Sequence, residues 1–176
     1  MKVTKQDKKE FLEVIQDIET NETVKQLHHF IQHCNTTRYE HCKEVAFFSY
    51  LLCKKYGLDY KAAARAGMLH DLFFYDWHNS KKELNLEHCH AIEHPRIALK
   101  NAKELFDLTE KEQDIIAKHM WPVTFALPRY KESFIITFVD KYCATKEFIA
   151  YMAKKIHFKE MYRFGYVLLS MLIIRF

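Results

Sequence analysis

The sequence has few of the residues that form tight turns. Among its 176 residues only 3 are Gly and 3 are Pro, which argues against a β-sandwich or β-barrel, because such folds need many tight turns. Neither a GxGxxG nor a GxxxxGK[ST] motif occurs. This absence excludes the glycine-rich loops that bind dinucleotides or nucleoside triphosphates through backbone amides.

Long apolar runs and clustered charges are also missing. The longest apolar run, Tyr166 to Ile174, is well short of the roughly 20 residues of a membrane-spanning helix. No apolar run follows the lysines after Met1, so we expect no signal peptide and no membrane partner. The net charge is only +4, with basic residues spread along the chain. We therefore expect no duplex nucleic acid as a partner.

The five Cys residues form no CxxC motif. Together with the missing secretory signal, this favours reduced thiols that pack as small apolar groups in a cytoplasmic protein. Cys42, next to His41, is expected to point to a different face of its helix and to be buried and inert.

The residues that are present predict a single all-α domain over residues 1–176. Apolar residues make up 49% of the chain and recur with helical spacing nearly throughout. We expect N-terminal helices over residues 1–35, a core over residues 37–147 and a helical extension over residues 148–176. Apolar stripes predict the first helices at residues 11–18 and 24–34.

Capping signals set the boundaries of the later helices. The capping box that begins at Thr37 predicts a helix from Arg38 to Gly57, and Asp59 can cap the next one. Pro95 is expected at the first position of a helix that ends near residue 106, and a second capping box at Thr109 predicts a helix ending near residue 119. Residues 134–139 and 164–176 fit a strand or a buried helix, and we interpret both as helical because helices flank them.

Histidine is abundant, with 11 residues. Five helical segments each carry His or Asp at i, i+4 from an apolar stripe, and this spacing turns the polar group inward. Burying so many polar groups without partners would be costly. A metal ion would remove that cost, since imidazole and carboxylate ligands suit Fe, Mn, Zn, Co or Ni. The inward-facing residues are His41, His70, Asp71, His94, His119 and Asp140.

The order of these six residues resembles the HD-domain superfamily of metal-dependent phosphohydrolases. The local sequence is similar too, in Arg38-Tyr39-Glu40-His41, in Ala66-Gly67-Met68-Leu69-His70-Asp71 and in Asp140-Lys141. The similarity spans roughly residues 37 to 147. The nearest branch is the one that includes bacterial symmetrical dinucleoside tetraphosphate hydrolases, which have the same two additional histidines.

The resemblance implies an all-helical bundle with a metal site in its core. It implies that His41, His70, Asp71 and Asp140 bind one metal ion, and that His94 and His119 add a second, bridged by Asp71. We expect iron first, with Mn, Co, Ni or Zn as alternatives. The implied reaction is hydrolysis of a phosphoester or phosphoanhydride, in a nucleotide or another small phosphate compound, by a metal-bound hydroxide.

One departure from the family pattern concerns the residues after the His-Asp pair. Many members have a small residue and a Lys there, whereas this chain has Leu72, Phe73 and Phe74. We expect the bulky aromatic residue to narrow or reshape the pocket. The cations best placed by sequence to hold a substrate phosphate are Lys141, Arg129 and Arg38, and Asp76 could orient a ligand or water.

Other histidines have alternative interpretations. His90 and His94 have an i, i+4 spacing that could bind zinc, but we prefer a loop or first-turn position for His88 and His90, because Pro95 limits the helix before His94. We interpret residues 28, 29 and 33, all histidines, as surface or packing residues.

Three functions are compatible with this sequence. The first is a phosphohydrolase, the second is a mixed-valent di-iron oxygenase that uses the same six ligands, and the third is a metal-stabilised module that binds a nucleotide without turnover. The ligand set does not separate the first two. The missing Lys slightly favours the third, whereas the complete ligand set disfavours it. A homodimer is compatible with the sequence but is not indicated by any motif.

Overall fold

The computed structural model describes residues 3–77 and 89–155. The helix expected at residues 164–176 lies outside this part of the chain. Most of the described residues are helical and the strands are limited to one short hairpin, which confirms the all-α prediction. In chain order the elements are α1 (Lys5–Val14), α2 (Gln16–Glu19), α3 (Glu22–Lys25), the 3-10 helix η1 (Gln26–His29), β1 (Ile31–His33), β2 (Thr36–Thr37), α4 (Arg38–Lys55), α5 (Tyr60–Leu69), α7 (His90–Leu105), α8 (Glu110–Lys118) and α9 (Lys131–Lys155).

Side-chain caps begin the central helices where the sequence predicts. Thr37 and Thr109 each accept a hydrogen bond from the backbone N–H three residues ahead, and Glu40 and Glu112 bond back to the cap backbone. These reciprocal bonds satisfy amide groups that have no partner within the helix. Asp59 caps α5 in the same way through the amide of Ala62. Residues 134–139 lie within α9, so the helical interpretation of that run is confirmed.

The two helices predicted near the N-terminus have wrong boundaries. Residues 24–34 do not form one helix, because the chain passes from η1 into an antiparallel hairpin in which Ile31 pairs with Thr37. Cys34 adopts a left-handed conformation, with φ 55°, and starts the turn of this hairpin. The stripe at residues 11–18 is likewise divided between α1 and α2, with Ile15 between them.

Pro95 does not begin a helix but lies inside α7, which starts at His90. Proline has no N–H, so its position within the helix leaves the carbonyl of Ala91 without its helical partner. Because α7 starts earlier, His90 lies in its first turn, which is the position that we preferred from the sequence. His90 and His94 are therefore on the same helix. The two rings stack with centroids 4.6 Å apart.

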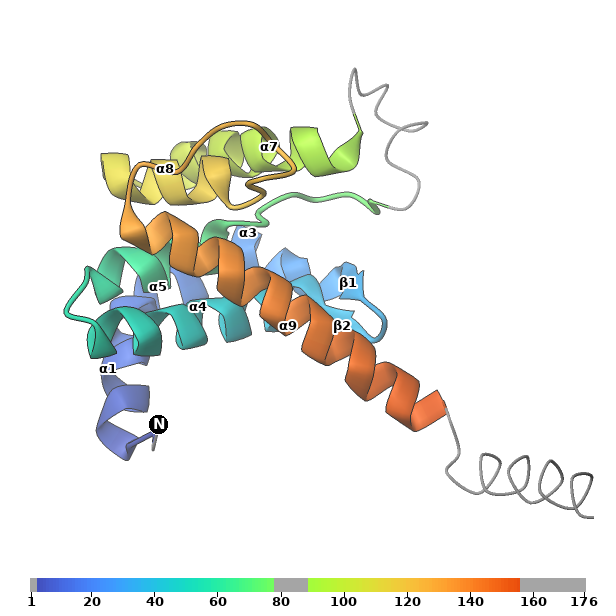
Figure 1. Ribbon diagram of the computed structural model, residues 1–176, viewed down its shortest axis with the longest axis horizontal. Coiled ribbons are helices and arrows are strands. Elements are labelled where there is room, and N and C mark those ends of the chain that lie inside the picture. The colour runs from blue at the N-terminus through green and yellow to red at the C-terminus, as the bar shows by residue number, and fades with distance from the viewer. Residues whose placement is uncertain (1–2, 78–88, 156–176) are drawn as a thin grey trace, which may run out of the picture.

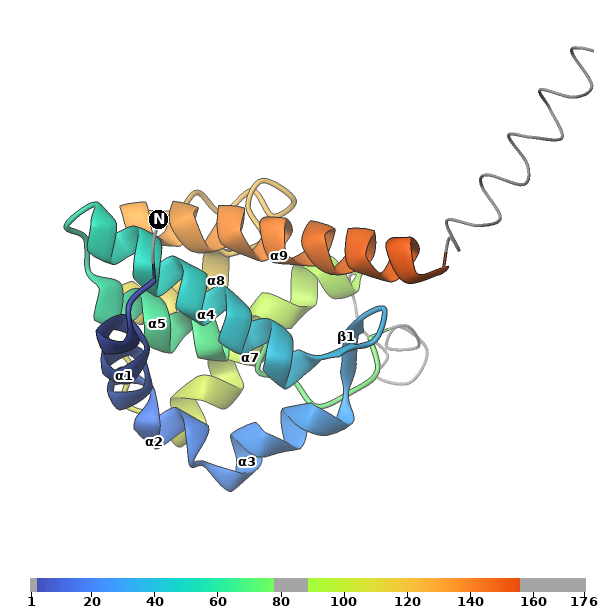
Figure 2. The same cartoon turned by 90° about the horizontal axis from the view of Figure 1, so that it is seen from below.

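The helices surround a core that contacts every long element. Figures 1 and 2 show α9 crossing α4 on one side, with α7 and α8 packed together, and α1 to α3 lie on the side away from α9. The end of α9 extends beyond the other described elements. α4 and α5 come close because position 67 is Gly: an added Cβ there would lie 2.6 Å from the Cα of Ala46. Within the described residues, no helix combines the length and apolar character needed to cross a membrane.

Candidate metal centre

The six residues singled out in the sequence lie together inside the bundle. They come from α4, α7 and α9 and from the positions that directly follow α5 and α8. The four histidine side chains and Asp71 are buried, and the Asp140 side chain is 13% exposed. Five elements distant in the sequence therefore deliver imidazole and carboxylate groups to one interior point.

Three of the histidines are oriented by helix carbonyls. His70 and His119 each directly follow the last residue of a helix, and the Nδ1–H of each donates to the carbonyl three residues back, at 2.8 Å and 2.9 Å. Carbonyls in a last turn have no intrahelical partner. In α7 the Nδ1–H of His94 donates to the carbonyl of His90 at 2.9 Å. A carbonyl can only accept, so Nδ1 carries the proton and Nε2 presents a lone pair to the centre.

The first group of side chains is rich in carboxylates. His41 Nε2 lies 3.0 Å from Asp140 Oδ1, and His70 Nε2 lies 3.7 Å from the same oxygen. Burial opposes a charge on His41, but its hydrogen bonds to Asp140 and Glu147 outweigh burial and raise the pKa of His41 to about 10. Burial would also raise the pKa of Asp140, yet the bonds to His41 and His70 hold that pKa well below its usual range.

The second group has two histidines and one carboxylate. His94 Nε2 lies 2.8 Å from His119 Nε2, and Asp71 Oδ1 lies 3.2 Å and 3.6 Å from these two atoms. Burial, followed by the electrostatic effect of the neighbouring His94 and His70, lowers the pKa of His119 to about 3. Two neutral rings that both present lone pairs at this distance repel each other, and either a proton or a metal ion between the two Nε2 atoms removes that repulsion.

Asp71 belongs to both groups. Its Oδ1 faces the second group, and its Oδ2 lies 3.6 Å from His70 Nε2 in the first. Burial would raise the pKa of this carboxyl, but the charges of His70 and His94 hold the pKa well below its usual range. His41, His70 and Asp71 offer ligand atoms within 4.8 Å of one another, and so do Asp71, His94 and His119.

These donors fit transition-metal ions. Neighbouring ligands of one ion with bonds of about 2.0–2.2 Å lie about 3–3.5 Å apart, close to the 2.8 to 3.6 Å separations in the second group. His70 Nε2 and Asp71 Oδ1 are buried and have no hydrogen-bond partner among the described residues. Buried polar atoms normally have partners, and a metal ion would be a suitable partner for these two atoms.

A chain of side chains holds Asp71 in place. Arg38 Nε donates to Gln32 Oε1 at 2.7 Å, and Gln32 Nε2 donates to Asp71 Oδ2. Because a guanidinium can only donate, it fixes the orientation of the Gln32 amide. Gln32 was missed in the sequence because it lies on β1, where a helix was expected.

Arg38 is not placed to contact a phosphate. Its guanidinium is buried, donates to the carbonyls of Phe73 and Tyr75, and lies 3.5 Å from the centroid of the Phe73 ring. The expected phosphate contact does not fit this placement, because these groups enclose the cation. Phe73 packs against His94, with ring centroids 5.7 Å apart. Phe73 is not among the residues that line the cavity beside the cluster, so it does not narrow that cavity.

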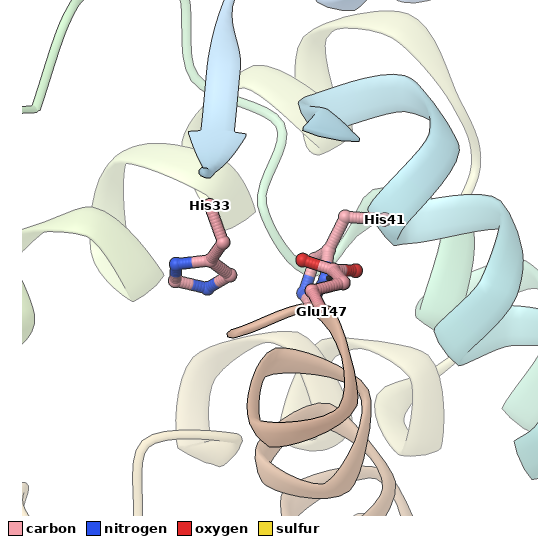
Figure 3. A group of neighbouring side chains, drawn as sticks. All are labelled: His33, His41 and Glu147. Carbon is pink, nitrogen blue, oxygen red and sulfur yellow. Dashed lines mark hydrogen bonds and ion pairs between the residues drawn. The ribbon is translucent and has the colours of Figure 1, made fainter. Parts of the chain in front are cut away.

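A further carboxylate lies beside the first group. Glu147 Oε1 accepts a hydrogen bond from His41 Nδ1 at 2.9 Å. Figure 3 shows this carboxylate with His41 and His33, and the three side chains offer ligand atoms within 4.8 Å of one another. His33, which the sequence suggests is a surface or packing residue, therefore lies near a buried carboxylate, because the hairpin brings it toward α9. Glu147 lies seven residues after Asp140, two helical turns along the same face, and this spacing could have revealed it.

A cavity of about 210 Å³ opens onto the cluster. Lys141 lines it, and its Nζ donates to the carbonyls of His119 and Thr137 at 3.4 Å each. Burial lowers the pKa of Lys141, and the charge of Asp140 opposes that effect. The lining also has aromatic rings, since Trp77 and His90 stack with centroids 5.7 Å apart. The lining includes Gln32, His33, Trp77, His90, Met120 and Lys141.

The remaining predicted residues lie at the surface. Asp76 and Arg129 are exposed, and neither is among the residues that line this cavity. The backbone N–H of Arg129 donates to Asp114 Oδ2 at 3.0 Å, which ties the loop before α9 to α8. The functional roles expected of Asp76 and Arg129 stay predictions. His88 lies outside the described residues.

Comparison with known proteins agrees with this site. The family model of the HD domain matches residues 38–145, a range that contains all six residues of the two groups. No curated protein and no solved structure matches the chain. Since the matched range covers more than half of the sequence, the chain belongs to the HD-domain family.

Proposed function

We propose that this protein is a metal-dependent phosphohydrolase that cleaves a phosphoester or phosphoanhydride bond in a nucleotide or another small phosphate compound. Its family generally contains such hydrolases. The observation that carries the proposal is the double role of Asp71, which lies in both ligand groups and has a buried oxygen without a partner among the described residues.

The proposed centre holds two divalent transition-metal ions. His41, His70, Asp71 and Asp140 would hold one, and Asp71, His94 and His119 the other. When bound, such ions lower the pKa of water toward neutrality and offset negative charge on phosphoryl oxygens. Iron is the metal we expect first.

The protein's own residues orient these groups and receive the substrate. Helix carbonyls point three imidazoles inward, and Gln32 directs the Asp71 carboxylate. Lys141 stands at the wall of the cavity. Its ammonium is suited to hold a phosphate oxygen beside the centre, and the aromatic rings of the lining suit an apolar or aromatic part of the same substrate.

Metal analysis of the purified protein, combined with phosphate-release assays on nucleotides and dinucleotides, tests the proposal. We expect between one and two ions per chain and metal-dependent release of phosphate. A folded protein that is metal-free without chelator treatment would refute it. Oxygen uptake by the iron form, in place of phosphate release, would favour the oxygenase, and nucleotide binding without turnover would favour the binding module.

A further inference from the structure

Glu147 lies behind His41, on the side of the ring away from the other proposed ligands. The two ring nitrogens face opposite groups: Nε2 is 3.0 Å from Asp140 Oδ1, and Nδ1 is 2.9 Å from Glu147 Oε1. The Glu147 side chain is only 6% exposed. A buried carboxylate therefore accepts the Nδ1–H of a histidine whose Nε2 faces the centre.

This arrangement separates His41 from the other three histidines. His70, His94 and His119 donate Nδ1–H to neutral backbone carbonyls close in sequence. His41 donates to an anion that lies 106 residues away, on α9. A carboxylate acceptor fixes the ring and makes the imidazole a stronger donor to a metal ion, and such outer partners are often worth tenfold to a hundredfold in metal affinity.

We propose that Glu147 is a positioning residue for the metal ion held by His41, and that it raises the affinity of that ion selectively. The inference rests on the proposed metal centre. Two residues of α9 then have different roles. Asp140 supplies a metal ligand, and Glu147, two turns later on the same face, orients and polarises the ligand His41.

A competing interpretation is a separate metal site formed by His33, His41 and Glu147. Within the described residues, no hydrogen bond joins His33 to Glu147, although the rings of His33 and His41 are in edge contact with centroids 5.3 Å apart. The hydrogen bond to Glu147 already uses the Nδ1 of His41. A metal there would have to replace that proton while Nε2 serves the main centre. The observed bonds therefore favour positioning over a further site.

The test measures metal affinity directly, by cobalt(II) titration of metal-free protein with a competing chelator, together with the visible spectrum of the cobalt form. Glu147→Gln keeps an oxygen that can accept Nδ1–H but removes the charge, and we expect about tenfold weaker binding of one ion. Glu147→Ala removes the acceptor as well, so we expect about a hundredfold weaker binding. The spectral contribution of the other ion should not change.

Glu132→Gln is the matched control. Glu132 is a buried carboxylate on the same helix, about two turns before Asp140, but it accepts bonds from the amide of Asp59 and from Lys111, and neither of these is a proposed metal ligand. The Glu132→Gln substitution should lower the melting temperature of the protein without changing its affinity for cobalt. His33→Ala should also leave the affinity within about twofold of the wild type.

The outcomes separate the two proposals. Wild-type protein that binds no cobalt would overturn the metal centre and this inference together. Wild-type protein that binds cobalt, with unchanged affinity in both Glu147 variants, would overturn the positioning role alone. Equal losses in Glu147→Gln and His33→Ala would also overturn it, in favour of a metal ion between those two residues.

Discussion

The two ends of the cluster differ in how they balance charge. At one end, His41 lies between two carboxylates, Asp140 and Glu147. At the other end, His94 and His119 face each other with Nε2 atoms 2.8 Å apart, and Asp71 is the carboxylate nearest to them. The first end is an ion pair even without metal, whereas the second has two imidazoles and one carboxylate, so a bound cation stabilises it more. Metal removal should therefore disturb the second end more than the first.

The ends also differ in what holds their ligands. His94 and His119 depend on carbonyls three or four residues back along the chain. His41 depends on side chains of α9, which are about 100 residues away. Local bonds form with the helix itself, while distant ones require the finished bundle. Mutations that shift α9 should thus affect the first end selectively.

The largest expected effect is that of Asp71→Ala, because Asp71 belongs to both ends of the cluster. The substitution should therefore weaken metal binding at both ends. We expect loss of nearly all bound metal and a fall in kcat/KM of about a hundred- to a thousandfold. Elemental analysis measures the bound metal, and phosphate-release kinetics on the same samples measure kcat/KM. Retention of two ions per chain would contradict the shared role of this carboxylate.

Substitutions at single ends come next. His94→Ala should empty only the second end, leaving about one ion per chain and a normal fold. His41→Ala should empty the first end and also destabilise the protein by about 3–5 kcal/mol, because Asp140 and Glu147 lose their buried partner. Denaturant unfolding of metal-free samples, beside metal analysis, distinguishes the two variants. If His94→Ala kept two ions, His90, whose ring stacks on His94, would be the better candidate ligand.

Lys141→Ala tests the cavity that both ends share. A charge-assisted hydrogen bond to phosphate is worth about 1.5–3 kcal/mol, so kcat/KM should fall by about ten- to a hundredfold with metal content unchanged. Lys146→Ala is the control, since Lys146 lies on the same helix but pairs with Glu44 at the surface. Kinetics within twofold of the wild type would show that Lys141 is an ordinary surface charge.

Gly67→Ala should have the smallest effect on metal affinity, and it should weaken metal binding at both ends of the cluster equally. His70 contacts the rings of His41 and His119, with centroids 5.5 Å and 5.0 Å away, and bonds to the carbonyl of residue 67. A Cβ at this position would press on Ala46 in α4, at a cost of about 1–3 kcal/mol.

The control is Gly57→Ala, where φ is 65° and no atom lies within 4 Å of the added Cβ. It should destabilise the protein by about 1–2 kcal/mol through backbone strain and leave metal affinity unchanged. Thermal unfolding and cobalt titration of both variants measure these effects. Weaker metal binding in Gly57→Ala, but not in Gly67→Ala, would contradict the role of the close helix contact.

Local sequence was sufficient for much of this structure. Thr37, Asp59 and Thr109 place helix starts correctly because a capping side chain acts within three residues. Helical spacing also shows which His and Asp residues share a face with the apolar core. Pro95 misled the prediction because α7 begins five residues earlier, at His90, so the proline lies inside the helix although it removes one carbonyl bond there.

The sequence by itself determined the helical class, the capped helix starts and the six inward-facing polar residues, because these follow from periodicity and from contacts over a few residues. Tertiary structure alone decided that Arg38 is enclosed and that Gln32 reaches Asp71. It also decided that Glu147 meets His41 across 106 residues. Spacing indicates which face of a helix a side chain occupies, but the packing of whole helices determines which faces meet.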